Sequence, residues 1–157
     1  MFRIVISIIV FTILKIKNVT SLPLLIFLLF LSDSLDCVSS PFPIDCISFY
    51  YQKNGEVVDL LMYTFFVTLF SNLFDDLTKK LLYGFILFRA IGVWKFYVTN
   101  DTKYLKYFPD FINSTLIAYA IYKQFSLSRD TYYILIIIGM IVKIIFEYKF
   151  HDKKRYR

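Results

Sequence analysis

Long apolar runs alternate with short polar stretches along this chain, and the runs define its predicted elements. Four runs approach the roughly 20 residues that cross a bilayer as a helix. They are Val57–Phe74, Leu81–Thr99, Phe111–Leu127 and Tyr132–Phe150. The connections between the first and second runs and between the third and fourth are short, so the runs they join must be antiparallel neighbours. Backbone polar groups in hydrocarbon must be bonded internally, so we expect an all-α fold, a polytopic transmembrane helical bundle with four good spans over residues 57–150.

An irregular hydrophobic region precedes these spans, over residues 1–31. It consists of two apolar pieces, Phe2–Leu14 and Leu22–Leu31, which Lys15 and Lys17 separate. Neither piece is long enough to span alone, so together they would form one irregular or tilted span or a re-entrant pair. The first piece also has the length of a signal-peptide core. We favour a retained anchor over a cleaved signal, because no small-x-small cleavage pattern follows.

The two remaining segments are polar. Residues 32–56 are rich in Asp, Ser, Pro, Asn and Gly, which predicts an extramembrane loop. Cys37 and Cys46 lie in this loop, and whether they stay reduced or pair depends on which side of the membrane holds them. Residues 151–157 form a basic tail.

Composition and charge narrow the class of protein further. The 157 residues are 58% hydrophobic, which is too apolar for a soluble domain of ordinary make-up. The 18 Lys and Arg exceed the 12 Asp and Glu, giving a net charge of +6. Nine of these cations fall on the side of the 32–56 loop and the tail, against at most six on the other side. The excess predicts a multi-pass integral membrane protein with a cytoplasmic C-terminus.

The chain lacks the motifs that would define an enzyme or a cofactor site. Phosphate-binding loops, dinucleotide-binding glycine patterns, nucleophile elbows and zinc-protease motifs are all absent from the sequence. Two cysteines and one histidine are too few for a zinc or haem centre. We therefore assign no catalytic residue, no cofactor and no metal site, which favours a non-enzymatic protein.

Charged residues inside the predicted spans mark the candidate site. Lys143, Glu147 and His151 follow one another at intervals of four, so they share one face of a helix. Arg89 lies near the middle of the second span, with Gly92 one turn later on the same face. Charges at such depth are costly and normally face a bundle interior, where they find partners. The candidate residues, all placed in the predicted cytoplasmic half, are Asp59, Arg89, Lys95, Asp110, Asn113, Lys143, Glu147 and His151.

Three short patterns resemble a group of small uncharacterised multi-pass membrane proteins. They are the R-x-I-G-V segment that begins at Arg89, the F-P-D element at Phe108–Asp110, and the K-x-x-x-E-Y-x-x-H ending that starts at Lys143. The resemblance covers about residues 57–152. Asp110 stands where the group is expected to carry Asn, so an amide-specific role does not transfer to it. The resemblance implies a topology and the position of a site, but no reaction.

Three functions remain open at this point. The first is a non-enzymatic membrane protein, structural or partner-binding, whose buried polar cluster fixes helix packing; its partners would be membrane lipids and a second copy or other membrane proteins, and not nucleic acid. The second is a small oligomeric transporter or proton- or ion-coupled carrier that uses Glu147, Asp59 and Arg89. The third is a membrane enzyme that modifies lipid headgroups. We rank them in this order, because ion pairs that fix helix register would already account for the charges.

Overall fold

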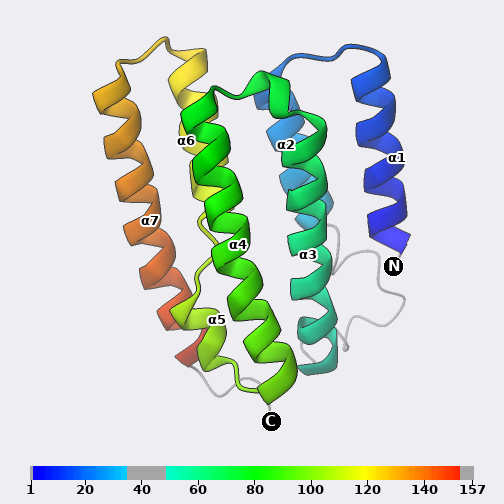
Figure 1. Ribbon diagram of the computed structural model, residues 1–157, viewed down its shortest axis with the longest axis vertical. Coiled ribbons are helices and arrows are strands. Elements are labelled where there is room, and N and C mark those ends of the chain that lie inside the picture. The colour runs from blue at the N-terminus through cyan, green and yellow to red at the C-terminus, as the bar shows by residue number, and fades with distance from the viewer. Residues whose placement is uncertain (1, 35–48, 153–157) are drawn as a thin grey trace. The chain divides into compact units, whose positions relative to one another are not determined.

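The computed structural model describes residues 2–34 and 49–152, and every regular element in these two ranges is helical (Figure 1). The helices are α1 (Phe2–Ile16), α2 (Leu22–Ser34), α3 (Phe49–Leu69), the short 3-10 helix η2 (Ser71–Leu73), α4 (Asp76–Thr99), α5 (Lys103–Tyr107), α6 (Ile112–Gln124) and α7 (Arg129–Asp152). The all-α prediction is confirmed for this part of the chain. Contacts divide it between residues 75 and 76 into two compact units. α3 belongs to the first unit, where it packs against α1, and α4, α5, α6 and α7 belong to the second.

The N-terminal hydrophobic region forms two separate helices rather than one irregular span. α1 ends where Asn18 adopts a left-handed conformation with φ of 52°. The Val19 N–H then bonds the Leu14 carbonyl at 3.0 Å, and the Asn18 N–H bonds the Lys15 carbonyl at 3.0 Å. This pair of bonds is the Schellman motif, which reverses the chain. Pro23 is the second residue of α2, in the first turn, where a helix does not need its N–H.

The first unit is held together by aromatic packing. The ring of Phe11 in α1 lies 5.3 Å from the ring of Phe66 and 6.2 Å from the ring of Phe70. Phe66 is in α3, and Phe70 directly follows it. Lys15 Nζ donates to Asn72 Oδ1 at 2.7 Å, which ties the end of α1 to η2. α3 begins at Phe49, not at the expected Val57. Asn54 and Gly55 predicted a loop, but each costs a helix only about 1 kcal/mol or less, which the packing of a 21-residue helix can offset.

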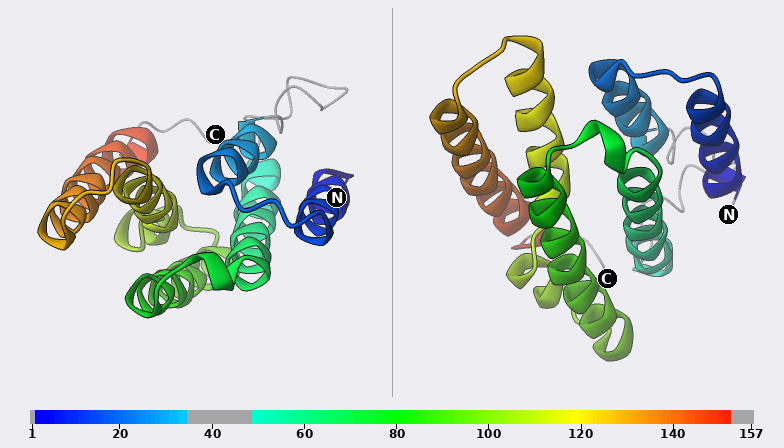
Figure 2. Two further views of the ribbon diagram at one scale, coloured as in Figure 1. Left: turned by 90° about the horizontal axis from the view of Figure 1, so that it is seen from above. Right: turned by 45° about the horizontal axis from the view of Figure 1, so that its top comes forward.

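The second unit contains α4, α5, α6 and α7. α6 packs against both α4 and α7, and α5 likewise contacts both (Figure 2). α4 and α7 run in the same direction, while α6 runs in the opposite one (Figure 1). The expected third span, Phe111–Leu127, is shorter in the structure: α6 has 13 residues and is about 20 Å long.

Within residues 2–34 and 49–152, two helices are long and apolar enough to cross a membrane. They are α4 and the Arg129–Tyr148 part of α7, with mean hydropathies of 1.5 and 1.8 over their best windows. Only 33% of the α4 window and 17% of the α7 window are buried. α1 and α2 contain shorter apolar stretches, Val5–Ile16 and Leu22–Leu31. Two of the four expected spans thus have the length and composition of a membrane crossing.

Candidate functional site

A glycine contact sets the register between α6 and α7. A Cβ atom at Gly139 would lie 2.8 Å from Ser114 Cβ, so the two helices approach closely there. Nearer the end of α7, Lys106 Nζ lies 5.7 Å from the centre of the Tyr148 ring. In an antiparallel pair, these two contacts place Lys143, one turn after Gly139, level with the segment before α6.

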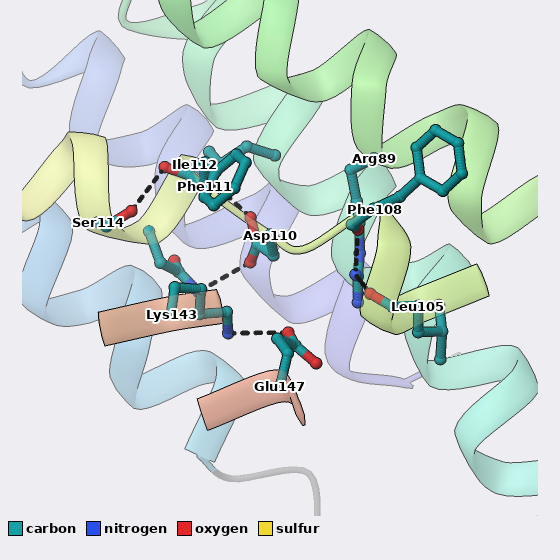
Figure 3. Close-up of polar contacts among 10 residues, drawn as sticks. Arg89, Leu105, Phe108, Asp110, Phe111, Ile112, Ser114, Lys143 and Glu147 are labelled. Atoms are coloured by element: carbon teal, nitrogen blue, oxygen red, sulfur yellow. Dashed lines mark hydrogen bonds and ion pairs between the residues drawn. The ribbon is translucent and has the colours of Figure 1, made fainter. Parts of the chain in front are cut away.

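That segment, residues 108–111, is a break between α5 and α6. We call this break, together with the charged side chains around it, the charged break. Pro109 has no N–H, so the Leu105 carbonyl lacks the donor that a continuing helix would supply. Arg89 supplies it from α4: its Nη1 donates to the Leu105 carbonyl at 3.2 Å and to the Phe108 carbonyl at 2.6 Å (Figure 3). Arg89 thereby completes the C-terminal end of α5.

Gly92 allows the break to lie against α4. It is one turn from Arg89, and a Cβ atom there would overlap Phe108 Cβ and lie 2.9 Å from Phe108 Cγ. The Phe108 ring also lies 4.9 Å from that of Phe88, which stacks at 5.9 Å on Phe111. The same face of α4 therefore provides both the space for Phe108 and the donor for its carbonyl.

Asp110 lies in the break, two residues before the start of α6. Its side chain is buried, and Asp110 Oδ1 accepts a hydrogen bond from the Ile112 N–H at 2.9 Å. Asp110 Oδ2 accepts a bond from Asn113 Nδ2 at 3.1 Å. A carboxylate that bonds the first turn of a helix satisfies one of its unbonded N–H groups and complements the positive end of its dipole.

α7 contributes an ion pair to the same unit. Lys143 Nζ lies 3.3 Å from Glu147 Oε1, one turn along the helix (Figure 3). The Glu147 side chain is 8% exposed and that of Lys143 is 27% exposed. The two residues are on the helix stripe that continues from Gly139, which contacts α6. The pair therefore faces the packed side of α7 rather than its open side.

The three remaining predicted site residues are Lys95, Asp59 and His151. Lys95 is exposed, and its Nζ lies 5.4 Å from the centre of the Trp94 ring, so it does not join the charged break. Asp59 is partly buried in α3, which belongs to the first unit. His151 belongs to α7 by its backbone, but its side chain lies outside the described residues, as do Cys37 and Cys46.

A second polar group joins the starts of α4 and α7, and the sequence alone did not reveal it. The hydroxyl groups of Thr78 and Tyr132 are bonded at 2.9 Å, and both residues are buried. The Tyr132 ring stacks on Tyr122 at 4.9 Å and meets Tyr119 edge-on at 5.8 Å. We call these four residues the tyrosine cluster. The three-residue spacing of the two tyrosines in α6 was the available signal, since it places both on one helix face.

The turn between α4 and α5 carries its own charged pair. Lys103 Nζ lies 2.7 Å from Asp101 Oδ2, and the Lys103 N–H donates to Asp101 Oδ1 at 3.0 Å. These bonds from Lys103 hold the pKa of Asp101 below its usual value. Both groups are open to solvent, so this pair shapes the turn and adds little to the stability of the fold.

Comparisons with known protein families, curated proteins and solved structures found no match to this chain. Within residues 2–34 and 49–152, no three His, Cys, Asp or Glu side chains gather where they could hold a metal ion. The site must therefore be interpreted from its own geometry.

Proposed function

We propose that this chain is a non-enzymatic, multi-pass integral membrane protein in which the charged break fixes the packing of α4, α6 and α7. Its immediate partners are membrane lipids, with a second copy or another membrane protein as a further partner. The observation that carries the proposal is the open apolar face of the second unit.

That face is continuous on α7. Large apolar side chains that are 40–63% exposed occupy its outer side: Ile134, Ile137, Ile138, Ile141, Val142, Ile144, Ile145 and Phe146. α4 adds others, with Leu87 at 66% and Trp94 at 61%. Scattered apolar residues are normal on a soluble surface, but a contiguous apolar patch of this kind marks a membrane or protein contact. Lipid chains would cover this face without requiring a specific partner.

The charged break fits a span that is interrupted inside the membrane. α6 is about 20 Å long, which is short of the roughly 30 Å hydrocarbon core. α7 contacts both α5 and α6, so α5, the break and α6 together run along one long helix. Irregular backbone is tolerated at membrane depth only where protein groups satisfy it. Arg89 does this for the Leu105 and Phe108 carbonyls, and Asp110 does it for the Ile112 N–H.

The use of the charged side chains favours a structural role over catalysis. Arg89 donates to backbone carbonyls, Asp110 accepts from the first turn of α6, and Lys143 pairs with Glu147. The Arg89 bonds join α4 to the end of α5 and to the break, whereas the Asp110 bond and the Lys143–Glu147 pair are local. The excess of Lys and Arg on the side of the tail supports a cytoplasmic C-terminus.

A small transporter or proton-coupled carrier is the second candidate. The interrupted α5–α6 span favours it, since transporters bind substrates and ions where spanning helices are broken. Glu147, Asp59 and Arg89 are the residues that it would use. It ranks second because Arg89 is already bonded to the carbonyls that an ion would need.

Placing a charge on the open face of α7 tests the membrane proposal. Ile138 is 51% exposed and lies near the middle of α7. In a bilayer, Ile138→Lys should cost about 2.5–3.5 kcal/mol and lower the fraction of chain that resists alkaline extraction from membranes. The matched control is Gln124→Lys, at the exposed end of α6, which should leave that fraction unchanged.

A soluble protein would give the opposite result. Replacing an exposed isoleucine by lysine would then improve solubility, and the unmodified chain would be released by alkaline carbonate. That outcome would remove the membrane proposal, and with it the interrupted span.

A further inference from the structure

One buried polar atom at the charged break has no hydrogen-bond donor. Asn113 Oδ1 is inaccessible to solvent, and no donor reaches it within the described part of the chain. A buried acceptor without a donor costs about 1–3 kcal/mol. Native proteins satisfy most such atoms with protein groups or with ordered water. An orphaned oxygen next to Asp110 therefore points to a bound donor.

The orientation of the Asn113 amide is set by its neighbour. Its Nδ2 donates to Asp110 Oδ2 at 3.1 Å, and an ionised carboxylate can only accept. Turning the amide over would bring its oxygen against the Asp110 oxygen. Asn113 Oδ1 is thus held in place as the atom that needs a donor. Asp110 Oδ2, which accepts the bond from this amide, keeps lone-pair capacity for a second bond.

Charge balance excludes a cation as the donor. Around the break, Arg89 and Lys143 carry positive charge, and Asp110 and Glu147 carry negative charge. The group is formally neutral as it stands. The N-terminal end of α6 is also the positive end of its dipole. An added cation would leave one uncompensated charge in a buried place, at a cost of several kcal/mol, whereas an uncharged donor would carry no such penalty.

Packing limits the size of the donor. Ser114, next to Asn113, is in close contact with Gly139 of α7, and Asp110 is 7% exposed. A water molecule needs two to four polar partners, and Asn113 Oδ1 and Asp110 Oδ2 supply two acceptors.

We propose that the charged break binds one small uncharged hydrogen-bond donor, the size of a water molecule, between Asn113 Oδ1 and Asp110 Oδ2. Water is the donor of this class that is always present. The site would make the break hydrated in the middle of the second unit. The inference does not depend on a membrane location, because Asn113 is enclosed by the unit itself.

Substitution of Asn113 gives the first test. With a bound donor, Asn113→Leu removes the bridge and strands the donor's partners, so the melting temperature should fall by roughly 2–4 °C. With a dry site, the same change removes an unsatisfied buried acceptor, which offsets the loss of the Asn113 Nδ2 bond to Asp110, so the melting temperature should stay unchanged or rise. Gln124→Leu is the matched control, since it removes an exposed amide at the other end of α6 and should leave the melting temperature unchanged.

A direct observation of water gives the second test. In protein with ¹⁵N-labelled asparagine, the Asn113 side-chain amide should show a nuclear Overhauser effect to a long-lived water molecule. The signal is assigned by its loss in Asn113→Leu. A melting temperature that stays unchanged or rises on Asn113→Leu, or a native amide with no effect to water, would each overturn the proposal. Neither measurement involves the open face of α7. Failure of the bound-donor proposal can therefore be distinguished from failure of the membrane proposal.

Discussion

The tyrosine cluster and the charged break lie at two levels of one helical unit and join its helices by different chemistry. At the first, two buried hydroxyls and three aromatic rings link the starts of α4 and α7 to the end of α6. At the second, Arg89 bonds the carbonyls of Leu105 in α5 and of Phe108 in the break, while Lys143 pairs with Glu147. Arg89 follows Thr78 by eleven residues and Lys143 follows Tyr132 by eleven residues, so both cations lie about 16 Å further along their helices.

The difference between the two levels follows from the state of the backbone. At the tyrosine cluster the helices are regular, and the bond between the Thr78 and Tyr132 hydroxyls joins two side chains; a neutral hydrogen bond of this kind contributes about 1 kcal/mol. At the charged break Pro109 and the end of α5 leave carbonyls without donors, and only a long cationic side chain from another helix reaches both. The charge is therefore placed where the backbone is irregular.

Removal of Arg89 is expected to have the largest effect. Arg89→Leu leaves the Leu105 and Phe108 carbonyls buried without donors and removes a cation from a balanced group. The free energy of unfolding should fall by about 3–5 kcal/mol. Arg89→Lys keeps a cation with several N–H donors and should lose less. Denaturant titration in detergent, followed by circular dichroism, measures both.

Lys95 supplies the control for that comparison. It is on the same helix and carries the same charge, but it is exposed beside Trp94. Lys95→Leu should change the free energy of unfolding by no more than about 0.5 kcal/mol. If the Arg89 and Lys95 substitutions cost the same, net charge rather than the break would explain the result.

The close approach of α4 to the break predicts an intermediate effect. In Gly92→Ala the new methyl group overlaps the Phe108 side chain, so the break must shift away from α4, at a cost of about 1–3 kcal/mol. Gly84→Ala is a matched control on the same helix, because nothing lies within 4 Å of its added Cβ. It should stabilise α4 by up to about 1 kcal/mol. Equal effects at Gly84 and Gly92 would mean that Phe108 does not pack on α4.

The regular parts of this fold could be predicted from apolar runs, and the irregular part could not. The runs located α4 and α7, because long uninterrupted periodicity determines a helix. The length of α6 was harder to predict, because the apolar run Phe111–Leu127 does not show where the helix begins and ends. From the sequence we predicted Arg89, Asp110, Asn113, Lys143 and Glu147 as site residues, because they are polar residues in or beside apolar runs. The bonds from Arg89 to the Leu105 and Phe108 carbonyls were not predicted, because no pattern of side chains encodes a backbone acceptor.

Breaking the tyrosine cluster should have the smallest effect of the three. Tyr132→Phe removes one hydroxyl but keeps the ring on Tyr119 and Tyr122, so we expect the loss of the hydrogen bond to Thr78 to cost about 1 kcal/mol. Thr78→Val removes the other hydroxyl at nearly constant volume. Because the two groups bond each other, the double variant should lose less than the sum of the single losses. A simple sum would show that the hydroxyls are satisfied separately, and that ring stacking alone joins the starts of α4 and α7.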